Sequence, residues 1–150
     1  MFAESSLYDT LPEVKSHGAT NRFVAKTLHR DEVVVDRTTG LMWQQASSSQ
    51  LMVYSLALEW INSLNKRSFA GFNDWRLPTL EEAETLIERS PNSAGLYIDP
   101  VFNSKQRSWM WTSDRGEADS AWYVNFNYGY SKLNRIKSGN NHVRAVRLRL

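Results

Sequence analysis

The side chains that usually carry catalysis are scarce or widely spaced in this 150-residue sequence. There is no cysteine, which excludes a thiolate nucleophile, a disulfide framework and a cysteine metal site. The histidines His17, His29 and His142 are far apart in the sequence, and none has the spacing of a metal-ligand motif. We therefore expect no metal, no cofactor and no enzymatic activity.

Two groups of polar residues near the middle of the chain resemble a calcium site and an acid–base site, and we interpret both as structural. Asn73 and Asp74 carry the oxygen ligands that calcium prefers, but we expect this pair to form a turn. A group of glutamates resembles a paired-carboxylate acid–base site, and we interpret it as the solvated face of one helix. The group comprises Glu81, Glu82, Glu84 and Glu88.

Tyrosine, asparagine and basic side chains gather near the C-terminus and are the candidate ligand-binding residues. Tyrosine supplies a large contact area at a low entropy cost, and asparagine supplies adaptable hydrogen bonds. The last acidic residue is Asp119, so the basic residues beyond it are unopposed in the sequence. The predicted ligand-binding set is Tyr123, Asn125, Asn127, Tyr128, Tyr130, Lys132, Asn134, Arg135, Lys137, Asn140, Asn141 and His142.

Two kinds of ligand fit this composition. A protein or a surface glycan would be bound mainly by the exposed tyrosines and asparagines. A polyanion, either a glycosaminoglycan or a nucleic acid, would combine charge and ring stacking from the basic and tyrosine residues of the same segment. The polyanion interpretation weakens if Arg144 and Arg147 are paired internally with carboxylates. A salt titration separates the two, because polyanion affinity falls steeply with ionic strength.

The elements that must position these side chains follow the order β, two helices, β. Apolar runs on both sides of the turn 36–40 predict β-hairpins at the start of the domain. Apolar residues at helical spacing then predict a helix that ends near Asn65. The members of this stripe are Tyr54, Ala57, Leu58, Ile61 and Leu64.

A second helix and a set of short strands complete the pattern. Thr79 and Glu82 are placed to form a capping box at the start of this helix, and Pro91 ends it. Its predicted core residues are Ala83, Leu86 and Ile87. We interpret residues 142–148 as a closing strand. The order of elements predicts an α+β fold in which two helices pack on short antiparallel sheets.

Strict alternation of residue type predicts a strand with one buried and one wet face just before the tyrosine-rich segment. Trp122, Val124 and Phe126 are predicted to face the core, and the polar residues between them to face solvent.

Three blocks of sequence carry a resemblance to a bacterial family. They are VDRTTGLMWQ at 35–44, AGFNDWRLPT at 70–79 and VRAVR at 143–147, and they occur in the order of the family. Over residues 22–148 the chain resembles the family typified by the C-terminal domain of the Legionella collagen-like adhesin. The resemblance implies a C-type-lectin-like fold of the formylglycine-generating-enzyme type and an adhesin-like, ligand-binding role. It also implies that Trp43 and Trp75, which lie in the first two blocks, are buried. The oxidation chemistry of the related enzymes uses cysteines and is not carried over.

A second resemblance covers residues 121–147, which look like the variable region of bacterial or phage proteins diversified by retroelements. These retroelements mutate adenines in a template rich in AAC asparagine codons, and most of the candidate residues are reachable from such a codon. Lys132 and Lys137 are not reachable and need a different template codon. The resemblance implies a hypervariable surface on a fixed scaffold. The positions expected to stay fixed are Trp122, Val124, Phe126 and Val143.

The predicted organisation is an N-terminal extension, residues 1–21, followed by a C-type-lectin-like ligand-binding domain, residues 22–150. A chain of this length buries a sizeable core without disulfides. It contains no run of about 18 apolar residues and no signal-peptide pattern, so we expect no membrane insertion. The sequence does not fix its location: we expect a cytoplasmic chain as written, or an exported one if a leader or partner domain is missing. The sequence is compatible with an oligomer and does not fix the oligomeric state.

Overall fold

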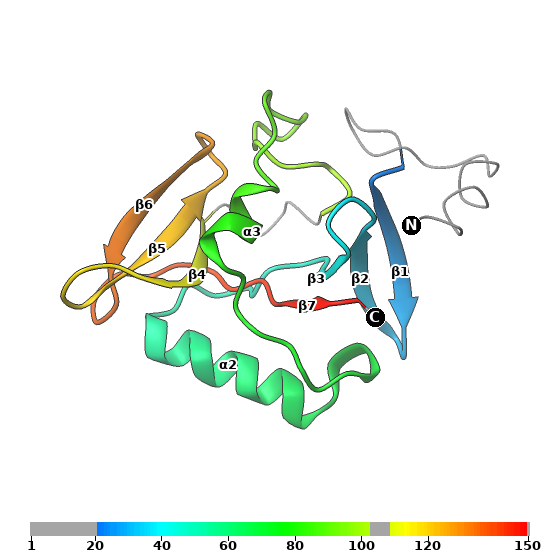
Figure 1. The fold of residues 1–150 in the computed structure, drawn as a ribbon, viewed down its shortest axis with the longest axis horizontal. Coiled ribbons are helices and arrows are strands. Elements are labelled where there is room, and N and C mark those ends of the chain that lie inside the picture. Colours follow the sequence, from blue (N-terminus) through cyan, green and yellow to red (C-terminus); the bar gives the residue numbers. More distant parts are fainter. Residues whose placement is uncertain (1–20, 103–108, 150) are drawn as a thin grey trace.

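The computed structural model describes residues 21–102 and 109–149, and these residues form an α+β fold with two antiparallel sheets and two α-helices. The predicted α+β class is confirmed. The predicted N-terminal extension lies outside the described residues, except for Asn21. In Figure 1 the two sheets lie on opposite sides of the molecule.

The first sheet joins the start of the domain to its end. Strands β1 (Phe23–Leu28), β2 (Asp31–Asp36) and β3 (Leu41–Gln44) pair in sequence order and antiparallel. The sheet ends with β7 (Val146–Leu148), which pairs with β3. The predicted β-hairpin start is confirmed. The closing strand is shorter than the predicted range 142–148.

The second sheet carries the candidate ligand-binding residues. It consists of β4 (Trp109–Arg115), β5 (Ser120–Asn125) and β6 (Tyr130–Arg135), with β5 in the centre. β5 and β6 form a hairpin whose register is unbroken from Ser120 opposite Arg135 to Asn125 opposite Tyr130. This hairpin forms one end of the molecule in Figure 1.

Helix α2 (Tyr54–Lys66) is amphipathic and ends next to the predicted position, Asn65. Its buried residues are Tyr54, Ala57, Ile61 and Leu64. Leu58, which we predicted to belong to the buried stripe, is 46% exposed because it lies at the outer edge of that stripe. Of the described helices, none has both the length and the hydrophobicity that crossing a bilayer requires.

Helix α3 (Leu80–Glu84) starts where the sequence predicts. Thr79 and Glu82 form the capping box, in which each side chain accepts a hydrogen bond from the other residue's backbone N–H. The helix is shorter than predicted, because the chain after it forms tighter turns. In these turns a backbone N–H bonds to the carbonyl three residues earlier, as from Leu86 to Ala83. Leu86 is still buried in the core.

The core contains two clusters of buried side chains, and strands such as β2 contribute to both. One cluster packs against α2, and the other includes Ala83 of α3. The predicted core residues Trp43, Trp75, Val124 and Phe126 are all buried. Trp122 is half-buried instead, and it lies opposite Leu133 of the edge strand, which is 45% exposed.

Candidate ligand-binding surface

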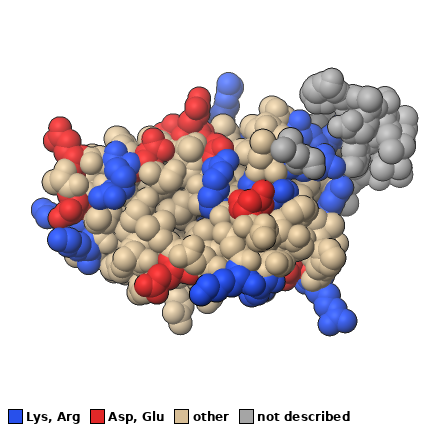
Figure 2. Space-filling model, turned by 60° about the horizontal axis from the view of Figure 1, so that its bottom comes forward, with Lys and Arg blue, Asp and Glu red and all other residues tan. Residues whose placement is uncertain are grey.

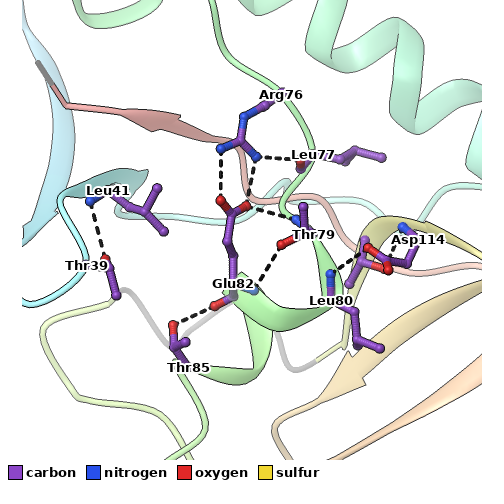
Figure 3. Close-up of polar contacts among 10 residues, drawn as sticks. Thr39, Leu41, Arg76, Leu77, Thr79, Leu80, Glu82, Thr85 and Asp114 are labelled. Carbon is purple, nitrogen blue, oxygen red and sulfur yellow. Dashed lines mark hydrogen bonds and ion pairs between the residues drawn. The ribbon is translucent and has the colours of Figure 1, made fainter.

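Polar contacts anchor α3 beside the sheet that carries the candidate residues (Figure 3). Arg76 donates hydrogen bonds to both carboxylate oxygens of Glu82, at 2.8 and 2.9 Å. The backbone N–H of Leu80 donates to the Asp114 carboxylate of β4 at 2.9 Å. The helix is thereby connected both to the chain before it and to the second sheet.

The glutamates of α3 are therefore more than the solvated face that we predicted. Burial by itself would raise the pKa of Glu82, but hydrogen bonds from Arg76 and Thr79 outweigh it and lower the pKa below its ordinary value. Ser131 of β6 donates its hydroxyl to Glu84 at 2.7 Å, which joins the helix to the outer strand of the second sheet.

The predicted ligand-binding residues fall into three groups by exposure. Tyr128, Lys132, Arg135, Lys137 and Asn140 are exposed. Tyr123, Asn127, Tyr130 and Asn134 are half-buried. Asn125, Asn141 and His142 are buried, so our prediction that all twelve face solvent is wrong for these three.

Asn125 is buried because it organises the turn of the β5–β6 hairpin. Its Oδ1 accepts a hydrogen bond from the backbone N–H of Asn127 at 2.8 Å, and its Nδ2 donates to Tyr130 Oη at 3.1 Å. Its backbone carbonyl accepts the N–H of Gly129 at 2.8 Å. Gly129 has a φ of 76°, a conformation that favours glycine.

The register of the sheet places several of the candidate residues on one face. Tyr123 lies opposite Lys132, and Asn125 lies opposite Tyr130. On the other side of β5, Trp109 of β4 lies opposite Asn125. Residues directly opposite each other in antiparallel strands share a face. We call this the aromatic face and define it as Trp109, Tyr123, Asn125, Tyr128, Tyr130 and Lys132.

A column of stacked side chains runs along β6 on the aromatic face. The Tyr128 and Tyr130 rings lie 6.1 Å apart between centroids and are almost parallel, with an interplanar angle of 3°. The Lys132 ammonium lies 4.8 Å from the Tyr130 centroid. Tyr128, at the tip of the hairpin, is 73% exposed. Tyr130 is thus held between Tyr128 and Lys132, whereas the outer ring, Tyr128, is mostly exposed to solvent.

Tyr123 connects the aromatic face to the core. It packs against the cluster that contains α2 residues, so the face that we predicted to be wet is partly covered. Burial raises the pKa of the Tyr123 phenol above its ordinary value, and the charge of Tyr130 and a hydrogen bond with it raise the pKa further.

Asn141 and His142 are buried because the chain returns from the hairpin through the middle of the fold. The backbone of Asn141 exchanges hydrogen bonds with Met52 at 2.9 and 3.1 Å. The backbone of His142 pairs with β4, donating to Trp109 at 3.0 Å and accepting from Trp111 at 3.1 Å. The His142 ring stacks on Trp109, with centroids 6.4 Å apart. His142 thus packs directly on Trp109 of the aromatic face.

The remaining basic candidates lie away from the aromatic face. Arg135 alternates with Asn134 and so points to the opposite side of β6. An open depression of about 580 Å³ lies at this end of the hairpin. It is lined by Glu117, Ala118, Asp119, Ser120, Leu133, Asn134, Arg135, Lys137 and Ser138. Lys137 pairs with Asp119 at 3.4 Å, so acidic side chains oppose the basic ones here.

Arg144 and Arg147 are engaged inside the fold. Arg147 donates to both carboxylate oxygens of Asp74, at 2.6 and 3.2 Å, and lies over the Phe72 ring. Arg144 is 3% exposed and donates to the backbone carbonyls of Gln44 and Gln45. The expected carboxylate pairing is therefore confirmed for Arg147, whereas Arg144 donates to carbonyl groups. Burial lowers the pKa of Arg144 to about 9.

The described residues offer neither a metal cluster nor one basic field on the face that α2 presents. In residues 21–102 and 109–149, no three His, Asp or Glu side chains are grouped so that they could hold a metal ion. In Figure 2, acidic and basic side chains on the visible face are interspersed around a broad uncharged area.

Sequence reasoning missed Trp109 as a member of the candidate surface. The tryptophan was visible as the start of a strand, but its position beside Asn125 depends on the register between β4 and β5. It also missed the role of Asn125, for which a signal existed. Asparagine commonly accepts a hydrogen bond from the backbone two residues ahead in a turn, and Asn127 occupies that position.

A family model described as the Lcl C-terminal domain matches residues 32–147. This range includes the three sequence blocks and the whole β5–β6 hairpin. No curated protein matches the chain.

Proposed function

This chain belongs to the Lcl C-terminal domain family, and we propose on that basis that it is an adhesin-like ligand-binding domain rather than an enzyme. The ligand contacts the aromatic face. The observation that carries the proposal is the stacked column on β6, in which the 73% exposed Tyr128 stands on the held ring of Tyr130.

The aromatic face has the properties of a pre-organised binding surface. Tyr130 is fixed by the hydrogen bond from Asn125 and by the ring and ammonium on either side of it. A side chain that is ordered before binding loses little further entropy when the ligand arrives. Tyrosine also offers both apolar area and a hydroxyl group, as in antibody loops.

The proposal divides the candidate residues by role. Tyr123, Asn127, Tyr128, Tyr130 and Lys132 contact the ligand, together with Trp109. Asn125, Asn141 and His142 are supports, because they are buried. The Asn125 side chain closes the hairpin turn, whereas the backbone of Asn141 bonds to Met52 and that of His142 bonds to β4. Asn134, Arg135, Lys137 and Asn140 form a rim that contacts only a large ligand.

We further propose a C-type-lectin-like fold and diversification of residues 121–147 by a retroelement. Support comes from the family membership and from the position of the asparagine-rich segment, most of which forms an outer hairpin rather than core. A near-copy of the codons for this segment in the flanking DNA, differing only at adenines and adjacent to a reverse transcriptase gene, is the expected finding. A flank without such a copy contradicts diversification.

A polyanion remains the alternative ligand, but the charges favour it less. Arg147 is bound to Asp74, Arg144 is buried, and Lys137 pairs with Asp119. These contacts reduce the number of basic residues after Asp119 that can replace counterions on a polyanion. Binding that weakens steeply between low and high salt would favour the alternative, whereas salt-insensitive binding supports the aromatic face.

The test compares variants on arrays of immobilised proteins and glycans. The wild-type chain is expected to bind at least one ligand. The double variant Tyr128→Ala with Tyr130→Ala is expected to bind that ligand with an affinity lower by more than about tenfold. Leu133→Ala is the matched control, because Leu133 is exposed on the opposite face of the same strand. A folded double variant that binds as well as the control would contradict the proposal.

A further inference from the structure

We propose that three residues of the β5–β6 hairpin, Asn127, Tyr128 and Lys132, determine which ligand is bound, whereas Asn125 and Gly129 must stay unchanged for the hairpin to form. The inference rests on the proposed function, because it divides the surface that contacts the ligand into exchangeable and fixed positions. The contacts that attach the hairpin to residues 84–97, which lie outside the predicted ligand-binding set, support this division.

Residues 84–97 hold the hairpin from the side opposite to the aromatic face. The backbone N–H of Tyr97 donates to the carbonyl of Phe126 at 2.7 Å, just before the turn. On the other strand, Ser131 donates its hydroxyl to Glu84 at 2.7 Å. Side chains alternate along a strand, so that of Ser131 points away from the aromatic face. The hairpin is therefore attached on one side and presents its exposed residues on the other.

Gly129 is the first fixed position. Its backbone has a φ of 76°, a left-handed conformation that favours glycine over residues with a side chain. A Cβ atom at this position would already contact Ile87 Cγ2 and Tyr97 Cγ, both at 3.4 Å. A larger side chain would push the turn away from residues 84–97, in addition to straining the backbone. We therefore expect only glycine to keep the hairpin in place here.

Asn125 is the second fixed position. Its side chain belongs to a residue that is 4% exposed, and it donates to Tyr130 Oη and accepts from the backbone N–H of Asn127. Ionised aspartate has the same shape but only accepts hydrogen bonds, and glutamine is one carbon longer. Asparagine is therefore the residue that satisfies both partners from this buried position.

The three exchangeable residues contribute little to this framework. Asn127 enters the turn through its backbone N–H, a group that every residue except proline has. Tyr128 is 73% exposed, and Lys132 is also exposed. Substitutions at exposed positions usually change stability little. The three side chains offer an amide, an aromatic ring and a positive charge, so exchanging them changes the chemistry that a ligand meets while the hairpin stays in place.

Site-saturation libraries of the full chain test the division between fixed and exchangeable positions. Each library replaces one residue, either Asn125, Asn127, Tyr128, Gly129 or Lys132, and protease treatment of displayed clones recovers those that fold. We expect asparagine and glycine to dominate the survivors at 125 and 129, and most amino acids other than proline to survive at the other three positions. Survival of many residues at 125 or 129, or of few at the other positions, would overturn the inference.

Thermal unfolding tests the contact of Gly129 with residues 84–97 separately. Gly40 has a similar φ of 78°, but nothing lies within 4 Å of a Cβ atom placed there. Gly129→Val and Gly40→Val therefore both strain the backbone, and only the first also displaces Ile87 and Tyr97. We expect a lower midpoint for Gly129→Val than for Gly40→Val. Equal midpoints would show that residues 84–97 do not hold the turn.

The arrays of immobilised proteins and glycans test the assignment of specificity. The variants Tyr128→Ser and Lys132→Glu are expected to fold and to bind a different set of array components from the wild-type chain. Lys132→Glu in particular should lose components that carry acidic groups. Leu133→Ala, on the opposite face of β6, should keep the wild-type set. If Tyr128→Ser and Lys132→Glu also keep it, the specificity assignment is wrong. The proposed function then stands if the double tyrosine variant loses the ligand, and fails if that variant binds normally.

Discussion

Asn125 donates its side-chain amide hydrogen to Tyr130 Oη at 3.1 Å, and this bond crosses from the central strand β5 to the edge strand β6. The same side chain accepts the backbone N–H of Asn127. One buried residue thus closes the hairpin turn and sets the position of an aromatic ring on the surface.

Replacing Asn125 by alanine should destabilise the domain and loosen the hairpin. The change leaves the Asn127 N–H and the Tyr130 hydroxyl without their partner, so we expect a loss of about 1–3 kcal/mol in the free energy of unfolding. Denaturant unfolding measures the loss, and faster amide exchange at residues 126–130 locates it. Asn140→Ala, at an exposed position, is the control. Equal stability of the two variants would show that Asn125 does not organise the turn.

Local signals allowed the helices and much of the core to be predicted from the sequence. The apolar stripe defined α2, because helical spacing needs no knowledge of distant residues. The spacing of Thr79 and Glu82 likewise defined the start of α3. Alternation placed Val124 and Phe126 in the core, and both are buried.

The path of the C-terminal segment was not predictable in the same way, because some of its backbone N–H groups bond to distant side chains and not to the backbone of a neighbouring strand. The backbone N–H of Ala145 donates to the side chain of Gln44, and that of Val143 donates to the hydroxyl of Ser48. Both contacts join residues about a hundred positions apart in the sequence. No local pattern indicated that this path would bury Asn141.

Acid should reveal the contribution of Glu82. Its folded-state pKa lies below the ordinary value of 4.5, so its stabilisation is present above pH 4.5 and is lost as the pH falls through the lower, folded-state value. Glu82→Gln is expected to cost about 0.5–1 kcal/mol at pH 7, since the partner Arg76 is partly exposed. The variant should also lose stability less steeply below pH 4.5. Parallel curves for the two proteins, measured by thermal unfolding from pH 7 to pH 3, would contradict this role.

Calcium and chelators should leave the fold unchanged. Both carboxylate oxygens of Asp74 accept hydrogen bonds from Arg147, which occupies the place that a cation would take. The bond to Arg147 also holds the pKa of Asp74 below its ordinary value, although burial acts in the opposite direction. Thermal unfolding with EDTA and with millimolar calcium should give the same midpoint. A midpoint that rises by several degrees with calcium would show that the Asp74 loop binds the ion.

The most direct test of the central claim is amide hydrogen exchange of the wild-type chain with and without the ligand identified on the arrays. Contact at the aromatic face predicts slower exchange within residues 123–132 on binding, with little change in α2 or in β1 and β2. Slower exchange confined to α2 or to the first sheet, with residues 123–132 unchanged, would place the ligand elsewhere and contradict the assignment of the aromatic face.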